Sequence, residues 1–347
     1  MAGYTAIDDP SIYFNTKLYT GNGSTDTAIT GVGFQPDFIW FKNRDTTDFH
    51  NCYDSVRGVQ KVLVPNGTDV EYTDDETLLA FGADGFTIGL RANVNENTED
   101  YVSWNWKAGT TTGIAGSPSI TPSSYSFNQT SGFSIIAYTG TGANATVPHG
   151  LGVIPGMIIV KTLNTLKDWD VYHTYAHATP EDYILVLNTT AAQADNNTAW
   201  NDTAPTSTLF SLGDGGDTNV NTKLYIAYCF ANVLGYSKFG SYTGNGAAEG
   251  PFVYTGFRPA WIMFKSVGTA PWAIYDDQRV GYNVVNNYLY ANTTEAEVTA
   301  ADIDILSNGF KLRNNGSAHN GSSQAYTYAA FAEAPLVNAE GVPVNAR

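Results

Sequence analysis

Apolar and polar residues alternate along much of this chain with a period of two, which is the period of a β-strand. The clearest alternation lies at 101–106, 225–230 and 326–331. Continuous apolar runs bounded by Gly or Pro and by Lys predict buried central strands at 37–41, 156–160 and 260–264. No window of helical length keeps an apolar period of 3.6 residues, although 295–306 could form a turn or two of helix. The pattern therefore predicts an all-β protein.

One motif occurs three times: Tyr-Thr-Gly-x-Gly, then a Pro, then an apolar run that ends in Lys. The copies begin at Tyr19, Tyr138 and Tyr242, and their lysines are Lys42, Lys161 and Lys265. An aromatic residue then precedes a Tyr in each copy: Phe49 before Tyr53, Trp169 before Tyr172, and Trp272 before Tyr275. A period of about a hundred residues matches the size of a domain. We predict three tandem antiparallel domains of one type, β-sandwich or jelly-roll-like, in a row.

The predicted domain boundaries follow the copies of the motif. The repeats occupy 17–109, 133–233 and 236–335, and the second is the divergent one. A linker rich in Ser, Thr, Gly and Pro at 110–132 is expected to run extended along the surface. An N-terminal arm at 1–16 and a C-terminal tail at 336–347 complete the chain. We expect both ends to lie on a neighbouring domain, with a partner-binding arm as the alternative.

The composition limits the partners. A net charge of -16 and a pI of about 4.5 argue against nucleic acid or an anionic membrane. The start of the chain does not resemble a signal peptide and no apolar run reaches the length of a membrane span, so we expect synthesis in the cytoplasm and no membrane insertion. Low charge together with many aromatic, Asn, Thr and Gly residues is typical of extracellular and virion β-proteins.

Candidate chemistry is sparse. His173 and His177 could bind zinc, but their stretch fits a loop better. Asp168 and Asp170, which flank Trp169, are the only candidate for a glycosidase pair. An Asp- and Asn-rich stretch at 214–221 could bind calcium, but it lacks the full twelve-residue pattern and a solvated turn explains it better. Cys52 and Cys229 fit buried free thiols. We therefore expect no catalytic residue, no metal, no cofactor and no enzymatic activity.

The recurring lysines and aromatic residues have a structural explanation. Each Lys ends a buried run, so its stem is expected to cover apolar surface while the amine reaches water or a carboxylate. The recurring aromatic residues are expected in the cores. Aromatic residues that do not recur are better candidates for an interaction surface. This candidate surface consists of Tyr4, Tyr13, Trp200, Tyr282, Tyr288 and Tyr290.

Several segments of the first copy resemble a known family. They are Gly-Phe-Gln-Pro-Asp-Phe-Ile-Trp-Phe-Lys-Asn-Arg at 33–44, Tyr-Asp-Ser-Val-Arg-Gly at 53–58, Asp-Gly-Phe at 84–86 and Trp-Asn-Trp-Lys-Ala-Gly at 104–109. Together they resemble a domain of unknown function found in structural proteins of tailed bacteriophages, particularly those of marine bacteria. The second copy lacks the Asp-Ser-Val-Arg-Gly element. The resemblance implies a virion component and carries over no catalytic residue.

Two placements in a virion are compatible with this resemblance. A particle-bound accessory or capsid-decoration protein would dock on other virion proteins by shape and apolar contacts, and would be oligomeric or present in many copies. A tail-fibre or receptor-binding protein would recognise host-surface glycans. The absence of a visible trimerising shaft favours the accessory protein. A polysaccharide-degrading enzyme is the third possibility.

Overall fold

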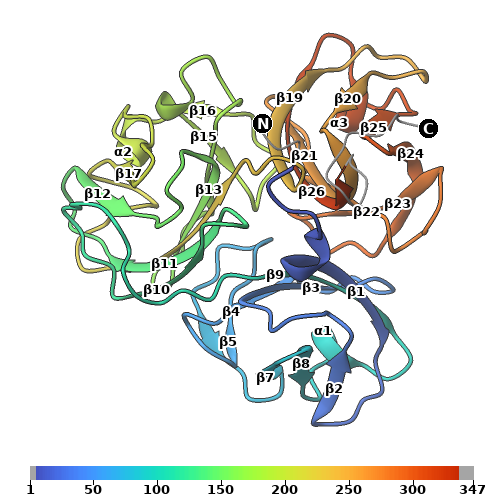
Figure 1. Cartoon of the computed structure of the whole chain (residues 1–347), viewed down its shortest axis with the longest axis horizontal. Coiled ribbons are helices and arrows are strands. Elements are labelled where there is room, and N and C mark those ends of the chain that lie inside the picture. The colour runs from blue at the N-terminus through green and yellow to red at the C-terminus, as the bar shows by residue number, and fades with distance from the viewer. Residues whose placement is uncertain (1–4, 336–347) are drawn as a thin grey trace.

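The computed structural model describes residues 5–335, and it confirms the all-β prediction (Figure 1). The strands gather in three lobes, which we call lobe 1 (14–106), lobe 2 (119–231) and lobe 3 (237–335). Among the described residues, no helix is long and apolar enough to cross a membrane. The predicted domain boundaries stay a prediction, because the lobes are defined here only by their sheets.

Lobe 1 follows a single 3-10 turn and contains nine strands and one short helix. Its elements are η1 (Pro10–Ile12), β1 (Phe14–Thr20), β2 (Thr27–Thr30), β3 (Phe38–Asn43), β4 (Asn51–Asp54), β5 (Lys61–Val62), β6 (Tyr72–Thr73), β7 (Leu78–Gly82), β8 (Gly85–Ile88), α1 (Ala92–Asn95) and β9 (Asp100–Trp106).

Lobe 2 also contains nine strands. Its elements are β10 (Ser124–Asn128), β11 (Phe133–Thr139), β12 (Ala145–Pro148), β13 (Pro155–Thr162), β14 (Asp170–His173), η2 (Pro180–Asp182), β15 (Tyr183–Val186), β16 (Ala194–Asp195), α2 (Asn197–Trp200), β17 (Leu209–Leu212) and β18 (Leu224–Ala231).

Lobe 3 contains eight strands. Its elements are β19 (Ser237–Thr243), β20 (Phe252–Tyr254), β21 (Phe257–Ser266), β22 (Ala273–Asp276), β23 (Val285–Tyr290), β24 (Val298–Leu306), β25 (Gly309–Leu312), α3 (Ser317–Asn320) and β26 (Ala325–Pro335).

The three lobes share one strand order. The large sheets contain β1-β9-β3-β4, β11-β18-β13-β14 and β19-β26-β21-β22, so the closing strand of each lobe always lies between the opening strand and the long apolar strand. In each lobe a smaller antiparallel group covers the outward face of the large sheet: β2-β8-β7, β12-β17 and β20-β25-β24. Separate apolar cores fill these sandwich-like pairs. In lobe 3 the pairing of β23 with β24 joins both groups into one eight-stranded sheet.

Two local predictions were wrong. The segment 295–306 forms β24 rather than a helical turn, because Ile303 and Ile305 alternate with polar residues and are buried. The predicted linker at 110–132 contains β10, which pairs with β11 and belongs to the large sheet of lobe 2. The predicted N-terminal arm at 1–16 ends in the first residues of β1, and its Ala6 N–H donates to the carbonyl of Leu234.

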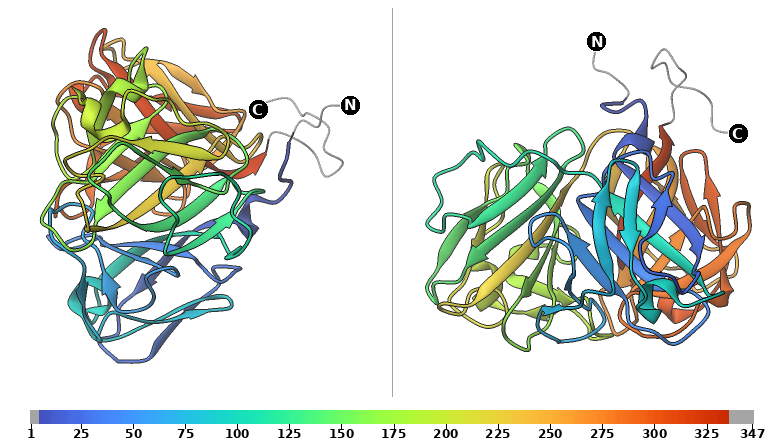
Figure 2. Two further views of the ribbon diagram at one scale, coloured as in Figure 1. Left: turned by 90° about the vertical axis from the view of Figure 1, so that its left-hand side faces the viewer. Right: turned by 90° about the horizontal axis from the view of Figure 1, so that it is seen from below.

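The sequence predicted three domains in a row, and this prediction was wrong. The lobes are arranged around a common centre (Figure 1). Two further views show the three lobes packed side by side (Figure 2). Each large sheet therefore has two buried faces, one toward the core of its own lobe and one toward the centre of the molecule.

Candidate functional site

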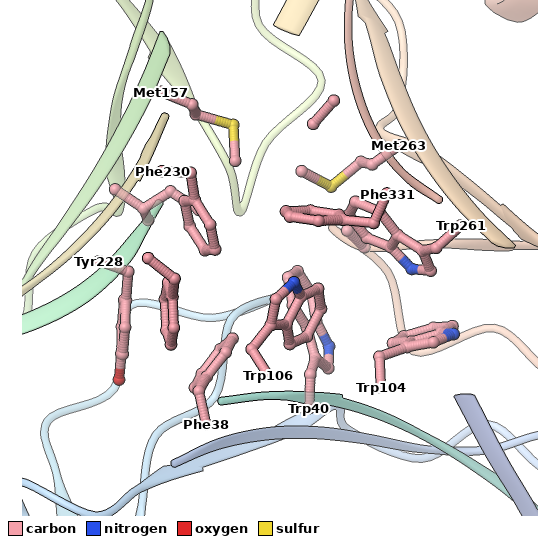
Figure 3. Close-up of a cluster of buried hydrophobic side chains, with 14 of the residues drawn as sticks. Phe38, Trp40, Trp104, Trp106, Met157, Tyr228, Phe230, Trp261, Met263 and Phe331 are labelled. Carbon is pink, nitrogen blue, oxygen red and sulfur yellow. The ribbon is translucent and has the colours of Figure 1, made fainter. Parts of the chain in front are cut away.

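Large apolar side chains fill the centre of the molecule, where the three large sheets meet (Figure 3). Lobe 1 contributes Phe38, Trp40, Trp104 and Trp106; lobe 2 contributes Met157, Tyr228 and Phe230; lobe 3 contributes Trp261, Met263 and Phe331. Trp106 touches both neighbours, at 6.3 Å from Phe230 and 5.5 Å from Trp261 between ring centroids. Burying each such side chain contributes about 1.5–3 kcal/mol, so the centre holds the lobes together as one body.

Main-chain hydrogen bonds between the lobes close a ring. In each lobe one N–H donates to the carbonyl of the residue two positions after the recurring Lys of the next lobe. The three pairs are Glu71 to Leu163 at 2.9 Å, Gln193 to Val267 at 2.9 Å and Glu297 to Arg44 at 2.8 Å. The contact from lobe 3 to lobe 1 matches the other two, although no direct chain connection joins these lobes.

Ring nitrogens make a second set of contacts between the same pairs of lobes, with donor and acceptor lobes exchanged. The pairs are Trp169 Nε1 to the Val64 carbonyl at 3.0 Å, Trp272 Nε1 to the Val186 carbonyl at 2.9 Å and His50 Nε2 to the Tyr290 carbonyl at 3.1 Å. The indole N–H of Trp40 can only donate, so His50 Nδ1 accepts it and His50 Nε2 carries the proton that reaches Tyr290. The residue equivalent to the two tryptophans is therefore the buried His50, not the exposed Phe49 that the sequence analysis aligned with them.

Buried carboxylates lie at two of the three junctions. Arg57 Nε donates to Asp54 at 2.5 Å, and the hydroxyl of Tyr228 from lobe 2 donates to the same carboxylate at 2.7 Å. At the next junction Asp276 accepts from Arg279 Nε at 2.7 Å and from Trp104 Nε1 of lobe 1 at 3.0 Å. Each carboxylate is thus paired and hydrogen-bonded, which offsets the cost of its burial.

The third junction differs on both sides. His173 occupies the place of Asp54 and Asp276, and it is followed three residues later by Ala176 where the other lobes have Arg. The partner lobe has Ala329 where the other lobes have Trp104 and Tyr228. His173 Nε2 instead contacts the Tyr328 carbonyl at 3.0 Å, and burial lowers the pKa of His173 to about 4. A neutral imidazole therefore replaces the charged group here.

The recurring lysines are completely buried, so the prediction that their amines reach water or a carboxylate was wrong. Lys42 donates to the carbonyls of Asn43 and Thr46, and Lys265 donates to those of Ser266 and Gly268. Lys161 donates to the Thr68 carbonyl of lobe 1 at 2.9 Å. Burial lowers the pKa of each amine to about 8. The lysines therefore hold the turns that follow the central strands.

The candidate metal ligands make other contacts. His173 binds the Tyr328 carbonyl, whereas His177 is exposed and lies beside Thr179. In the stretch 214–221, Asp217 pairs with Lys167 at 2.8 Å and Asn219 is buried against main-chain carbonyls. Over the described part of the chain, no three His, Cys, Asp or Glu side chains gather in a way that could hold a metal ion. Cys52 and Cys229 are buried free thiols.

The two carboxyl groups of the candidate glycosidase pair in lobe 2 have different surroundings. Asp168 accepts a hydrogen bond from Asn188 at 2.7 Å, whereas Asp170 is buried on β14 and its Oδ1 has no partner. Burial, together with the nearby Asp217 and Asp168, raises the pKa of Asp170 to about 8. Asp170 is therefore a neutral acid below the surface, out of reach of a polysaccharide.

The described residues of the aromatic candidate surface do not form one exposed surface. Trp200 and Tyr288 are buried, so they belong to the cores: Trp200 donates to the Tyr183 carbonyl and Tyr288 packs on His319. Tyr13 and Tyr290 are half-buried, and Tyr4 lies outside the described residues. Only Tyr282 is freely exposed, at 73%. Trp200 and Tyr288 lie in polar stretches of the sequence, but they pack on residues elsewhere in the chain that the local pattern could not reveal.

Two other surfaces expose apolar side chains together. The apolar hollow, of about 420 Å³ between lobes 1 and 2, is lined by Phe49, Val64, Asp69, Val70, Tyr72 and Leu166. The edge groove, of about 430 Å³, lies along β19 and β20 of lobe 3, and Tyr175 of lobe 2 borders it. Leu166 is 65% exposed, and Tyr254 in the edge groove is 55% exposed. Nothing in the local sequence distinguishes these residues from core positions, because both surfaces form only where lobes or strand edges meet.

A family model described as "Domain of unknown function (DUF7483)" matches residues 9–335. The match thus spans all three lobes. No curated protein matches the chain.

Proposed function

The chain belongs to the DUF7483 family, a domain family without an assigned function, and we propose that it is a structural protein of a bacteriophage particle. In this proposal it is an accessory or capsid-decoration protein that docks on other virion proteins and catalyses no reaction. The sequence resemblance to virion structural proteins suggests the setting. The single observation that carries the docking role is the apolar hollow.

The apolar hollow suits a protein partner. Phe49, Tyr72 and Leu166 are exposed around it, and Asp69 is its only charged lining residue. Exposed apolar patches with a polar surround are typical of protein interfaces. The hollow is held by two lobes that the central cluster fixes together, so a partner would meet a preformed surface.

The test is the abundance of the protein in purified particles of the phage that encodes it. We expect a copy number comparable to that of the major capsid protein, measured by quantitative mass spectrometry. Leu166→Asp should lower this copy number, because it places a charge in the apolar hollow. Leu90→Asp makes the same change at an exposed leucine elsewhere and should leave it unchanged. Absence of the protein from particles would refute the proposal.

Recognition of host-surface glycans at the tail is the second candidate. The exposed rings of Tyr175, Phe252 and Tyr254 around the edge groove favour it, because aromatic faces with polar neighbours suit sugar rings. A copy number matching a tail or vertex component, together with binding to a host polysaccharide, would place this function first.

A further inference from the structure

The edge groove lies between the two outermost strands of one sheet. In lobe 3 the eight-stranded sheet begins with β19 and ends with β20. Among residues 5–335, β19 pairs along its length only with β26, and β20 only with β25. Both strands therefore present unpaired main-chain groups, which is the arrangement that invites another extended chain.

Hydrogen bonds at the ends of β19 show which of its groups face outward. The N–H of Phe239 donates to the side chain of Asn232 at 2.8 Å rather than to β26. Because main-chain direction alternates along a strand, Ser241 directs its N–H and C=O to the same outer side. Ser241 lines the edge groove.

Hydrogen bonds also show which main-chain groups of β20 face outward. The Pro251 carbonyl accepts from the N–H of Leu312, the last residue of β25, and the Thr255 N–H donates to the carbonyl of Asn308, just before β25. Phe252 and Tyr254 therefore direct their main-chain groups toward the groove. Lys238 reaches across from β19, and its Nζ donates to the Tyr254 carbonyl at 2.9 Å. One lysine side chain thus connects the two strands, which do not pair with each other.

Lobe 2 has the same pair of edges, and there they are filled. β11 is equivalent to β19, and β10 pairs with its outer edge. The N–H of Ser123 donates to the Ala137 carbonyl at 2.9 Å, and Ala137 is equivalent to Ser241. On the opposite edge the N–H of Ile120 donates to the Thr146 carbonyl of β12 at 3.0 Å. The segment 119–128 therefore binds both edges at once.

No such segment precedes lobe 3. The connection between β18 and β19 consists of residues 232–236 only, whereas the connection from β9 to β11 is long enough to contribute β10. The edges that the chain fills in lobe 2 are thus left open in lobe 3.

We propose that the edge groove of lobe 3 binds an extended peptide segment of a partner protein, which pairs with β19 and β20 as β10 and its preceding residues pair with lobe 2. Only another extended backbone offers alternating donors and acceptors to two facing strand edges. This proposal does not depend on the virion setting, because it concerns the isolated protein.

The lining of the groove defines the chemistry of the segment. Lys238 is the only charged lining residue. It is equivalent to Ser134, which lies opposite Phe127 of β10. An acidic residue at the place of Phe127 would therefore face Lys238, and apolar residues beside it would cover the exposed rings of Phe252 and Tyr254.

Binding of two labelled peptides to the purified full-length protein tests the proposal. One has the sequence of residues 119–128, and the other carries Phe127→Glu. We expect saturable binding by fluorescence anisotropy, tighter for the Phe127→Glu peptide and weakened by salt. Ser241→Pro removes an outward N–H without touching the β26 ladder and should weaken binding about tenfold, whereas Ser241→Ala should not. Lys238→Met should abolish the preference for Glu.

Each other result overturns the proposal. Failure of both peptides to bind would do so, provided that circular dichroism shows the protein folded. Equal binding to Ser241→Pro and Ser241→Ala would show that the peptides do not use the β19 edge. Displacement of bound peptide by neutral oligosaccharides would assign the groove to sugars instead. None of these results bears on the abundance of the protein in particles.

Discussion

At the scale of single residues, the junctions show paired substitutions within one chain. Where Asp54 and Asp276 give way to His173, the donor from the neighbouring lobe gives way to Ala329. A carboxylate without its donor would be a buried charge with too few hydrogen bonds, and an indole or phenol without its acceptor would be an unpaired buried donor. The divergence of the second repeat, which the sequence alone left unexplained, follows from this coupling.

The hydrogen bond between Tyr228 and Asp54 should contribute measurably to stability. Tyr228→Phe removes a buried bond to a charged group, and we expect the free energy of unfolding to fall by about 2 kcal/mol. Urea titration followed by fluorescence measures it. Tyr282→Phe, at an exposed hydroxyl, is the matched control and should change nothing. Equal midpoints for the two variants would contradict the role of the junction.

The buried imidazole of His173 should make the protein sensitive to acid. Its pKa is lowered to about 4 in the folded state, against about 6.5 when unfolded, so the stability it contributes is present above pH 6.5 and lost as the pH falls toward 4. His173→Gln should therefore lose about 2 kcal/mol less than the wild type between pH 7 and pH 5. Urea midpoints at both pH values measure this difference. Parallel losses in the two proteins would show that His173 does not titrate in this way.

The sequence predicted which residues are buried better than it predicted what they touch. The recurring aromatic residues other than Phe49, and the cysteines, are in cores. Lys161, however, donates to Thr68 of another lobe, and the core residues Trp200 and Tyr288 stand in polar stretches. Contacts of this kind depend on neighbours that are distant in the chain. No periodicity within a strand records them.

At the scale of elements, the central strands were predictable and the added ones were not. The apolar runs of β3, β13 and β21 stand out because both of their faces are buried. In β10 only Tyr125 and Phe127 interrupt a polar run, so composition favoured a linker. In β24 the acidic residues before Val298 suggested a helix, although pairing with both β23 and β25 decides the structure. In both segments, pairing with neighbouring strands overrides a weak local preference.

The segment that fills lobe 2 should matter for stability, unlike a linker. Ile120 is buried in the core of lobe 2, and Ile120→Ala should lower the free energy of unfolding by about 3 kcal/mol. Thr111→Ala changes an exposed residue of the same connection and should be neutral. Urea unfolding of both variants gives the comparison. A neutral Ile120→Ala would restore the linker interpretation.

At the scale of the whole molecule, the repeats predicted three similar units but not their arrangement. The central strands carry apolar residues on both faces, and a free-standing sandwich would leave one of those faces in water. Phe38 and Trp40 point to the centre, whereas Ile39 and Phe41 lie in the core of lobe 1. The sequence analysis predicted that these strands are buried, but it did not predict that each sheet packs on a second partner. The sequence pattern also could not show that the three lobes pack around one centre.

Because equivalent contacts join all three pairs of lobes, the molecule should stay assembled even if the backbone between two lobes is cut. Residues 111–117 are largely exposed, while lobe 1 is held by lobe 2 through Glu71 and by lobe 3 through Arg44. Cutting the chain at a protease site inserted there should yield two fragments that co-elute at the size of the intact protein. They should separate only in denaturant. Elution as two species under native conditions would show that the backbone, rather than the shared centre, keeps the lobes assembled.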